Sequence, residues 1–232
     1  TDGGSNWKNI SDKYFGSSIG SVSVAPSDEN IIYVGEGENT MRGNVSEGLG
    51  GMWRSEDGGR TWKNIGLKEG RHIIRIVIHP RDPNTVWAAV MGHLFGPNDE
   101  RGIYKTTDGG KTWKTITNNL PERGTSYTIA EDHVNRNLLF VGTEFGLFVS
   151  IDGGAKWIQL KGGLPTISIK DLEIQKREND LILATFGRGF YVLDDYTPLR
   201  NLKRDDLEKQ AVIFPVKDAL MFMPSLPLGV RG

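Results

Sequence analysis

Residues 106–113 read TTDGGKTW, and the same pattern recurs as SEDGGRTW at 55–62 and as SIDGGAKW at 150–157. A shortened copy, DGGSNW, occupies residues 2–7. The aspartates of the four copies are therefore 55, 51 and 44 residues apart, a period typical of repeat folds that place about four strands in each unit. The pattern predicts a repeat architecture.

The chemistry of the pattern favours a structural role. Gly109 and Gly110 permit the positive φ angles of a tight turn, and the short carboxylate of Asp108 is suited to accept backbone N–H groups of that turn. Trp113 then opens the next strand and offers a large apolar surface to a neighbouring unit. We therefore expect turn and core roles, away from any active site, for Asp2, Asp57, Asp108, Asp152, Trp7, Trp62, Trp113 and Trp157.

Each repeat contains three further strand-like segments rich in β-branched and aromatic residues. The first strands are 21–24, 75–78, 127–130 and 171–174; the second are 31–34, 85–88, 138–141 and 181–184; the third are 51–54, 102–105, 146–149 and 189–192. Turns rich in Asn, Asp and Pro separate the first strand from the second. The sequence predicts an all-β fold, a β-propeller of four-stranded antiparallel blades.

The two ends of the repeat region predict how the ring closes. The last unit, residues 167–195, lacks a fourth strand, whereas residues 7–10 form a fourth strand without the other three. We therefore expect residues 5–11 to pair with residues 190–193, which completes a fourth blade and removes two exposed sheet edges. Residues 1–196 form the predicted propeller, and residues 197–232 form a C-terminal extension that packs on it.

Composition excludes several classes of function. The 232 residues contain 28 Lys and Arg against 29 Asp and Glu, so there is no basic surface typical of nucleic-acid binding. Cysteine is absent, which excludes thiolate chemistry and disulfides. No apolar run is long enough to span a bilayer, and residues 1–16 lack the features of a signal peptide. Neither a metal site nor a cofactor motif is predicted.

The long loops are the predicted binding surface. In a propeller, the loops between strands 2 and 3 share one face with those that join consecutive blades, and the aspartate turns lie on the other face. Residues 36–51 and 92–101 exceed ordinary hairpin loops in length, which makes them candidates for binding. The candidate residues on this face are Glu36, Glu38, Asn39, Arg42, His93, Asn98, Asp99, Glu144, Phe145 and Arg188.

Two alternatives stay open for the charged candidates. Glycoside hydrolysis requires two carboxyl groups about 5 to 9.5 Å apart, and Glu36 or Glu38 with Glu144 are candidates for that pair. The favoured alternative is that Glu144 caps a turn and the other two are solvated. Arg188, between two glycines, either binds a ligand carboxylate or forms an ion pair with Asp194 or Glu144, and the second role is preferred.

The repeats resemble the Asp-box (BNR) repeats of sialidases, xyloglucanases and sortilin-type propellers. A closer similarity is to a large bacterial group of secreted proteins that are often labelled glycosyl hydrolases and carry sortilin-like propeller repeats. The similarity rests on Ser18-Ile19-Gly20, on Phe186-Gly187-Arg188-Gly189 and on the segments 35–39, 92–102 and 142–146. Members of that group carry more repeats, which suggests that blades are missing between about residues 117 and 126.

The resemblance implies an extracellular or cell-envelope location and a non-catalytic module that binds protein or glycan. The alternatives are a glycoside hydrolase of xyloglucanase or sialidase type and a structural fragment of a larger multi-propeller protein. The expected partner is a protein, a glycan or another propeller module of the same parent protein. A sialidase would also need an arginine cluster and a tyrosine nucleophile, and the sequence does not supply that set in order.

Overall fold

The computed structural model describes residues 3–16, 18–39, 44–96, 98–216 and 218. It is an all-β structure of four antiparallel sheets, with one short helix, α1 (Pro198–Asn201), and two 3-10 turns, η1 (Lys68–Gly70) and η2 (Arg204–Glu208). In the described part of the chain, no helix has the length and apolar character needed to cross a membrane.

Each sheet is one blade, and its strands follow one another from the inner to the outer edge. The first blade contains β1 (Ile19–Ala25), β2 (Asp28–Glu36), β3 (Met52–Ser55) and β4 (Lys63–Asn64). The second contains β5 (Ile73–Ile78), β6 (Val86–Val90), β7 (Gly102–Thr106) and β8 (Lys114–Thr115). The third contains β9 (Ser126–Glu131), β10 (Leu139–Thr143), β11 (Gly146–Ser150) and β12 (Ile158–Leu160). The fourth contains β13 (Ile169–Gln175), β14 (Asp180–Thr185) and β15 (Phe190–Leu193).

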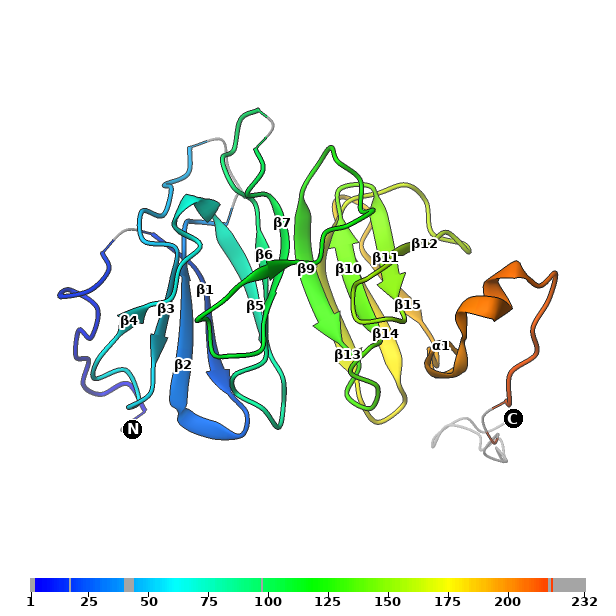
Figure 1. The fold of residues 1–232 in the computed structure, drawn as a ribbon, viewed down its shortest axis with the longest axis horizontal. Helices are drawn as coiled ribbons and strands as arrows, with labels where there is room; N and C mark the ends of the chain where they lie inside the picture. Colours follow the sequence, from blue (N-terminus) through cyan, green and yellow to red (C-terminus); the bar gives the residue numbers. More distant parts are fainter. Residues whose placement is uncertain (1–2, 17, 40–43, 97, 217, 219–232) are drawn as a thin grey trace, which may run out of the picture.

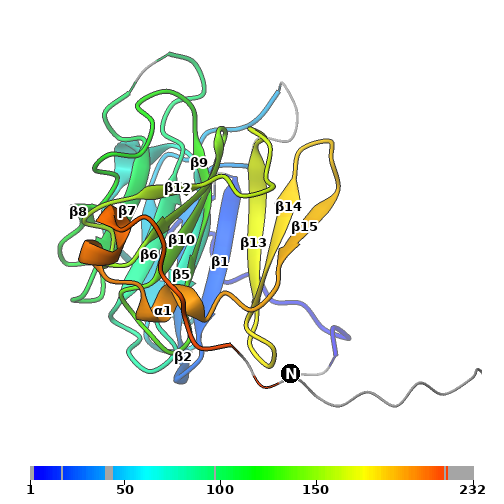
Figure 2. The ribbon, with the colours of Figure 1, turned by 90° about the vertical axis from the view of Figure 1, so that its right-hand side faces the viewer.

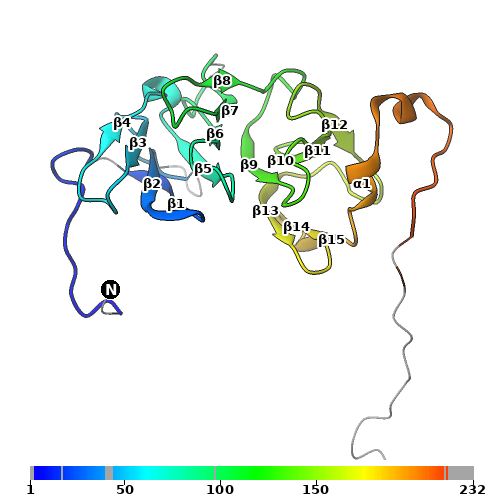
Figure 3. The same cartoon turned by 60° about the horizontal axis from the view of Figure 1, so that its bottom comes forward.

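The blades stand side by side in chain order and form an arc (Figures 1 and 3). Their innermost strands contact one another in sequence, β1 with β5, β5 with β9 and β9 with β13. The predicted propeller blades are therefore present, and the four described blades form an arc whose first and last blades do not pair.

The apolar core lies between blades. Tyr33 and Met52 of the first blade, both fully buried, share a cluster with Ile73 and Val86 of the second. Equivalent clusters join the second blade to the third and the third to the fourth. Because each blade is hydrophobic on both faces, it is stable when a neighbour covers each face.

The aspartate turns are tied together by their own side chains. Asp108 accepts hydrogen bonds from the backbone N–H and the hydroxyl of Thr112, at 3.0 and 2.6 Å, and from the hydroxyl of Thr106 at 2.7 Å. Asp57 has the equivalent bonds, and the contacts from Thr61 lower its pKa to about 2. These aspartates hold the turn, as the sequence predicted.

A tryptophan follows each turn and fastens its blade to the preceding one. Trp113 Nε1 donates to the backbone carbonyl of Ile65, at the end of the preceding blade's fourth strand, with a length of 2.8 Å. Trp157 makes the same bond to Ile116. This contact, repeated at successive joints, helps to set the relative position of neighbouring blades.

The structure does not confirm the predicted ring closure. The last sheet has three strands, with β15 at its edge, and residues 5–11 form no strand (Figure 2). Instead, the carbonyl of Ile10 accepts a hydrogen bond from Trp62 Nε1 of the first blade at 3.1 Å. The physical reason is that the angle between blades is set locally at each joint, and the three joints between four blades leave the two ends of the arc apart (Figure 3).

Two of the predicted structural residues at the N-terminus behave differently from the rest. Trp7 is 90% exposed, so its predicted core role is wrong, because no neighbouring strand covers it among the described residues. Asp2 lies outside the described residues.

The joint between the second and third blades is continuous. Residues 116–125 connect β8 to β9, and Asn119 of this segment accepts a hydrogen bond from the Trp157 N–H at 2.8 Å and donates one to the Trp157 carbonyl at 2.9 Å. Trp87, Ile103 and Ile129 share one buried cluster across the joint. The two blades are therefore packed as direct neighbours at the place where the sequence suggested missing blades.

The segment after the last blade packs against the third and fourth blades. Leu199 of α1 packs against the cluster between the third and fourth blades, and Arg204 forms an ion pair with Asp152 at 3.5 Å. Further along, Ile213 and Val216 are 95% and 89% exposed, and the predicted apolar cluster at 219–223 lies outside the described residues.

Candidate functional site

The two ends of the strands form two distinct faces (Figure 1). We call the upper one in Figure 1 the loop face; it carries the connections 37–39 and 44–51, 92–96 and 98–101, 116–125, 144–145, 161–168 and 186–189. The opposite box face carries the aspartate turns and the turns between the first and second strands of each blade. The sequence-predicted binding residues that are described all belong to the loop face or border it.

Glu36 is buried and anchors a loop, so the favoured expectation that it is solvated is wrong, because the loop folds back over its carboxylate. It is 2% exposed, and its Oε2 accepts hydrogen bonds from the backbone N–H groups of Leu49 and Gly50, both at 3.0 Å. Its Oε1 accepts a third bond from Trp53 Nε1 at 2.6 Å. A carboxylate that accepts three bonds inside the protein is committed to holding residues 37–51 in place.

Glu38 and its neighbours brace the same loop. Its carboxylate accepts a bond from the Ser46 N–H at 3.2 Å, and its backbone carbonyl lies 2.9 Å from Nδ1 of the buried His72. Its own N–H donates to the Ser18 hydroxyl at 3.0 Å. Asn39 beyond it is exposed, and Arg42 lies outside the described residues.

The second long loop is organised by a residue that the sequence analysis did not select. Arg101 donates from Nε to the Met91 carbonyl and from Nη2 to the His93 carbonyl, both at 2.8 Å. Asn98 also donates to the His93 carbonyl, at 3.2 Å, while Asp99 is exposed. Three donor groups on two carbonyls of one loop give the loop a fixed shape. The arginine at the C-terminal end of the loop is the sequence feature from which this role could have been predicted.

A contact between His93 and Glu47 brings the two long loops together. His93 Nδ1 lies 3.6 Å from Oε1 of Glu47, and both side chains are close to half exposed. The contact places residues 92–101 beside residues 37–51 on the loop face. The sequence had assigned both loops to this face, but it gave no pairing between them.

The short turns of the third and fourth blades expose the remaining candidates. Glu144 is exposed and accepts a 3.4 Å hydrogen bond from the Thr125 N–H, while Phe145, 37% exposed, lies over Gly124. Arg188 is exposed and makes no hydrogen bond or ion pair with a described residue. The preferred ion pair of Arg188 with Asp194 or Glu144 is therefore not formed among the described residues.

The three candidate carboxylates for glycoside hydrolysis are bonded to different backbone segments. Glu144 accepts from the Thr125 N–H, Glu36 from those of Leu49 and Gly50, and Glu38 from that of Ser46. The exposed groups of the loop face are instead chemically mixed: aromatic at Phe95, which is 85% exposed, and cationic at Arg188.

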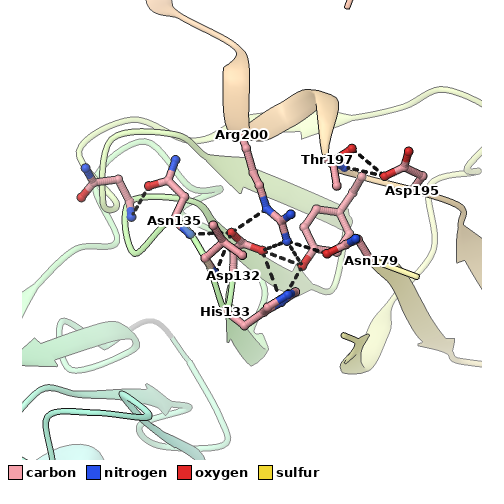
Figure 4. A network of polar contacts seen from close by, with 10 residues as sticks. Asp132, His133, Asn135, Asn179, Asp195, Thr197 and Arg200 are labelled. Atoms are coloured by element: carbon pink, nitrogen blue, oxygen red, sulfur yellow. Dashed lines mark hydrogen bonds and ion pairs between the residues drawn. The ribbon is translucent and has the colours of Figure 1, made fainter. Parts of the chain in front are cut away.

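A buried polar network on the box face was not anticipated from the sequence (Figure 4). Asp132, whose side chain is fully buried, accepts two bonds from Arg200, at 2.9 and 2.7 Å, and one from the Tyr196 hydroxyl at 2.7 Å. Arg200 also donates to Asn179 at 2.8 Å. Burial favours the neutral acid, but the bonds from Arg200 and Tyr196 outweigh it and lower the pKa of Asp132. The network fastens α1 to the third and fourth blades.

Next to this network is a pocket of about 370 Å³ that contains an unsatisfied carboxyl group. Glu131 is 5% exposed at its side chain, its Oε1 has no hydrogen-bond partner, and burial raises its pKa to about 7. His79 Nε2 lies 3.8 Å from that oxygen. His79 Nδ1 accepts bonds from the N–H groups of Arg81 and Asp82, which places its hydrogen on Nε2, facing Glu131.

No group of three or more His, Asp or Glu side chains suited to hold a metal ion occurs in the ranges that the structure describes.

Comparison with solved structures identifies the same blade architecture in larger proteins. A GH74 enzyme from Niastella koreensis superposes with a TM-score of 0.58 at 16% identity, over 78% of this chain and 29% of that chain. YCF48 bound to D1 peptide superposes with a TM-score of 0.53 at 15% identity, over 79% of this chain and 53% of that one. At these identities the likeness establishes the fold alone.

Sequence relatives are also much longer than this chain. It is 25% identical over 158 residues to a probable oligoxyloglucan-reducing end-specific xyloglucanase of Neosartorya fischeri, and 34% identical over 83 residues to the vacuolar protein sorting/targeting protein 10 of Sordaria macrospora. These matches cover 61% and 35% of this chain, but 17% and 5% of the relatives.

A family model describes the first two blades. Residues 1–119, just over half of the chain, match the Sortilin-Vps10 model, described as sortilin, neurotensin receptor 3. The match ends within the joint between the second and third blades. Together with the repeated tryptophan turns and the arc of four-stranded sheets, this match shows that the chain belongs to the Sortilin-Vps10 family.

Proposed function

We propose that this chain is a non-catalytic binding module, located outside the cell or in the cell envelope, whose loop face binds protein or glycan. The observation that carries the proposal is the contrast between Glu36, which is buried and committed to three hydrogen bonds, and Arg188, which is exposed and free of partners among the described residues. The carboxylate of Glu36 holds the loop in place, while the guanidinium of Arg188 faces solvent.

The loop face also has the character of a recognition surface. Phe95, Phe145 and Phe186 are 85%, 37% and 72% exposed, and aromatic and arginine side chains are enriched among residues that dominate binding interfaces. Residues 92–101 are braced by Arg101, so their shape is set before a ligand arrives. Rigid loops with exposed aromatic groups favour binding of a protein or glycan surface.

The comparisons support both ligand classes. YCF48, which has this fold, is described in complex with a peptide, and the relatives named xyloglucanase act on a glycan. Both classes of ligand contain groups that suit Arg188 and the phenylalanines, because a guanidinium binds carboxylates and sugar rings stack on aromatic faces.

A binding and hydrolysis screen tests the proposal. Isothermal titration with xyloglucan oligosaccharides and a peptide array should identify a ligand, and the reducing-end assay should detect no cleavage. Arg188→Ala should weaken binding by about tenfold at an unchanged melting temperature. The matched control is Arg177→Ala, an exposed arginine in the β13–β14 turn on the box face, which should leave affinity unchanged. If Arg177→Ala loses binding and Arg188→Ala keeps it, the ligand does not bind at the loop face.

A second candidate function, glycoside hydrolysis, is favoured by the xyloglucanase relatives and by the exposed carboxyl groups of Asp99 and Glu144 on the loop face. If the screen detects release of reducing sugar and Glu144→Gln abolishes it, the chain is a hydrolase and the non-catalytic proposal fails.

A further inference from the structure

The last blade exposes an apolar position that every other blade buries. Phe190 pairs with Ala184 across its sheet, as Met52 does with Gly35, Ile103 with Ala89 and Leu147 with Gly142. The other three are 0%, 0% and 2% exposed because the next blade covers them, whereas Phe190 is 77% exposed. Val192 on the same face is 54% exposed.

The first blade exposes the complementary position on its opposite face. Val22 occupies the place in β1 that Ile76, Ile129 and Leu172 occupy in β5, β9 and β13. Those three are 4%, 0% and 1% exposed because the preceding blade covers them, whereas Val22 is 59% exposed. The two ends of the arc are therefore the two halves of the interface that recurs between blades.

A groove of about 460 Å³ lies between the third and fourth blades, where the other joints hold a tryptophan. Trp157 packs against Leu120 and donates to the Ile116 carbonyl at the joint before it. The groove presents Leu164 and Leu160 at the corresponding positions of the next repeat, together with apolar side chains of β14 and β15.

The chain also carries a second segment with the sequence of a fourth strand. Residues 7–10, WKNI, repeat the sequence of residues 62–65, and Trp7 is 90% exposed although Trp62 is 8% exposed. The Ile10 carbonyl already accepts the bond from Trp62 Nε1 that Ile65 and Ile116 accept from the tryptophans that follow them. Residues 7–10 therefore lie beside the first blade where the fourth strand of a preceding blade belongs.

We propose that two copies of this chain associate head to tail, so that residues 7–10 of each copy form the fourth strand of the other copy's last blade. Trp7 fills the groove and donates from Nε1 to the Leu160 carbonyl, and Lys8 pairs with Val192, as Lys63 pairs with Arg54 in the first blade. Phe190 is covered by the first blade of the partner copy.

This assembly uses contacts of a kind already present in the molecule. The interface between copies is continuous with those between blades, and both free edges, β15 and residues 7–10, are satisfied at once. Head-to-tail contacts close into a ring when the rotation completes a turn, and two arcs of four blades give eight, within the typical range of propellers.

A cross-linking experiment tests the pairing directly, because the chain contains no cysteine of its own. A Lys8→Cys chain is mixed with a Val192→Cys chain under a glutathione redox buffer, and a disulfide-linked heterodimer is expected on a non-reducing gel. Lys13→Cys, an exposed lysine outside the strand, replaces Lys8→Cys as the matched control and should give no heterodimer. An equal yield with both lysine variants, or no heterodimer, would overturn the pairing.

The oligomeric state provides an independent measurement. Light scattering after size exclusion should give twice 25.7 kDa for the unmodified chain. Trp7→Ala should weaken dimerisation by at least about tenfold with no change in the circular dichroism spectrum, since Trp7 contacts solvent in the single copy. Phe95→Ala, which removes another exposed aromatic group, should leave the dimer intact. A monomeric unmodified chain would refute the proposal.

Discussion

Replacement of Glu131 by glutamine should change how stability depends on pH. The Glu131 side chain is 5% exposed, its Oε1 has no hydrogen-bond partner, and burial raises its pKa from 4.5 to about 7. Between these values the unfolded chain loses the proton while the folded chain keeps it, so the folded state becomes less stable as pH rises. The protonated Glu131 therefore contributes its full share of folding stability below pH 4.5, and this share is lost by about pH 7.

The magnitude follows from the same two values. The difference between 4.5 and about 7, at about 1.4 kcal/mol per pH unit, corresponds to about 3 kcal/mol of unfolding free energy. Glu131→Gln cannot ionise, so between pH 4.5 and pH 8 its stability should gain about 3 kcal/mol relative to the unmodified chain. Any constant difference from altered hydrogen bonds cancels in this comparison.

Urea unfolding of both chains across this pH range gives the required free energies. Glu122→Gln, which alters an exposed glutamate on the loop face, is the matched control and should follow the unmodified chain. If the Glu131→Gln and unmodified curves run parallel, Glu131 ionises normally in the folded state and the reasoning from its buried pocket is refuted.

Three further changes test the structural assignments. Arg200→Met should destabilise the fold by about 3 kcal/mol in urea unfolding, because it leaves the fully buried Asp132 without its cation. The control Arg204→Met, at an exposed ion pair, should destabilise it by less than about 1 kcal/mol. Equal effects of the two substitutions would contradict a stabilising role of the network. Asp108→Ala should lower the melting temperature and affect ligand binding only through stability, and a fully stable variant that no longer binds would reverse that assignment. Glu36→Ala should speed hydrogen exchange at the backbone amides of residues 49 and 50, and unchanged exchange there would show that another group holds the loop.

The sequence predicted the local architecture because that architecture depends on local chemistry. The Asp-Gly-Gly turn with Thr112 two residues beyond Gly110 satisfies its own hydrogen bonds, and the alternating apolar strands around it follow from the spacing. The strand order within each blade could be predicted from the four repeats, but the predicted fourth strand of the last blade is absent from the described sheet. The contact of Trp113 with a neighbouring unit also followed from its place in the pattern, whereas the structure shows that this unit is the preceding blade.

The candidate site was predicted in outline but not in its assignments. Loop length selected residues 36–51 and 92–101, yet whether Glu36 is catalytic or structural depends on which N–H groups approach it, and those come from residues 13 to 17 positions away. The Asp132–Arg200 pair spans 68 positions, and no local pattern connects its members. Such long-range contacts have no sequence signal in a single chain.

The amino-acid sequence by itself determined the aspartate turns, the strands and the family of fold, since each repeat specifies a blade through contacts among neighbouring residues. The tertiary structure decided that the four blades form an open arc, that Trp7 is exposed and that the buried Oε1 of Glu131 has no hydrogen-bond partner. The physical reason is that curvature accumulates over successive joints and burial depends on which blade lies opposite, and both are properties of the packed assembly rather than of any single segment.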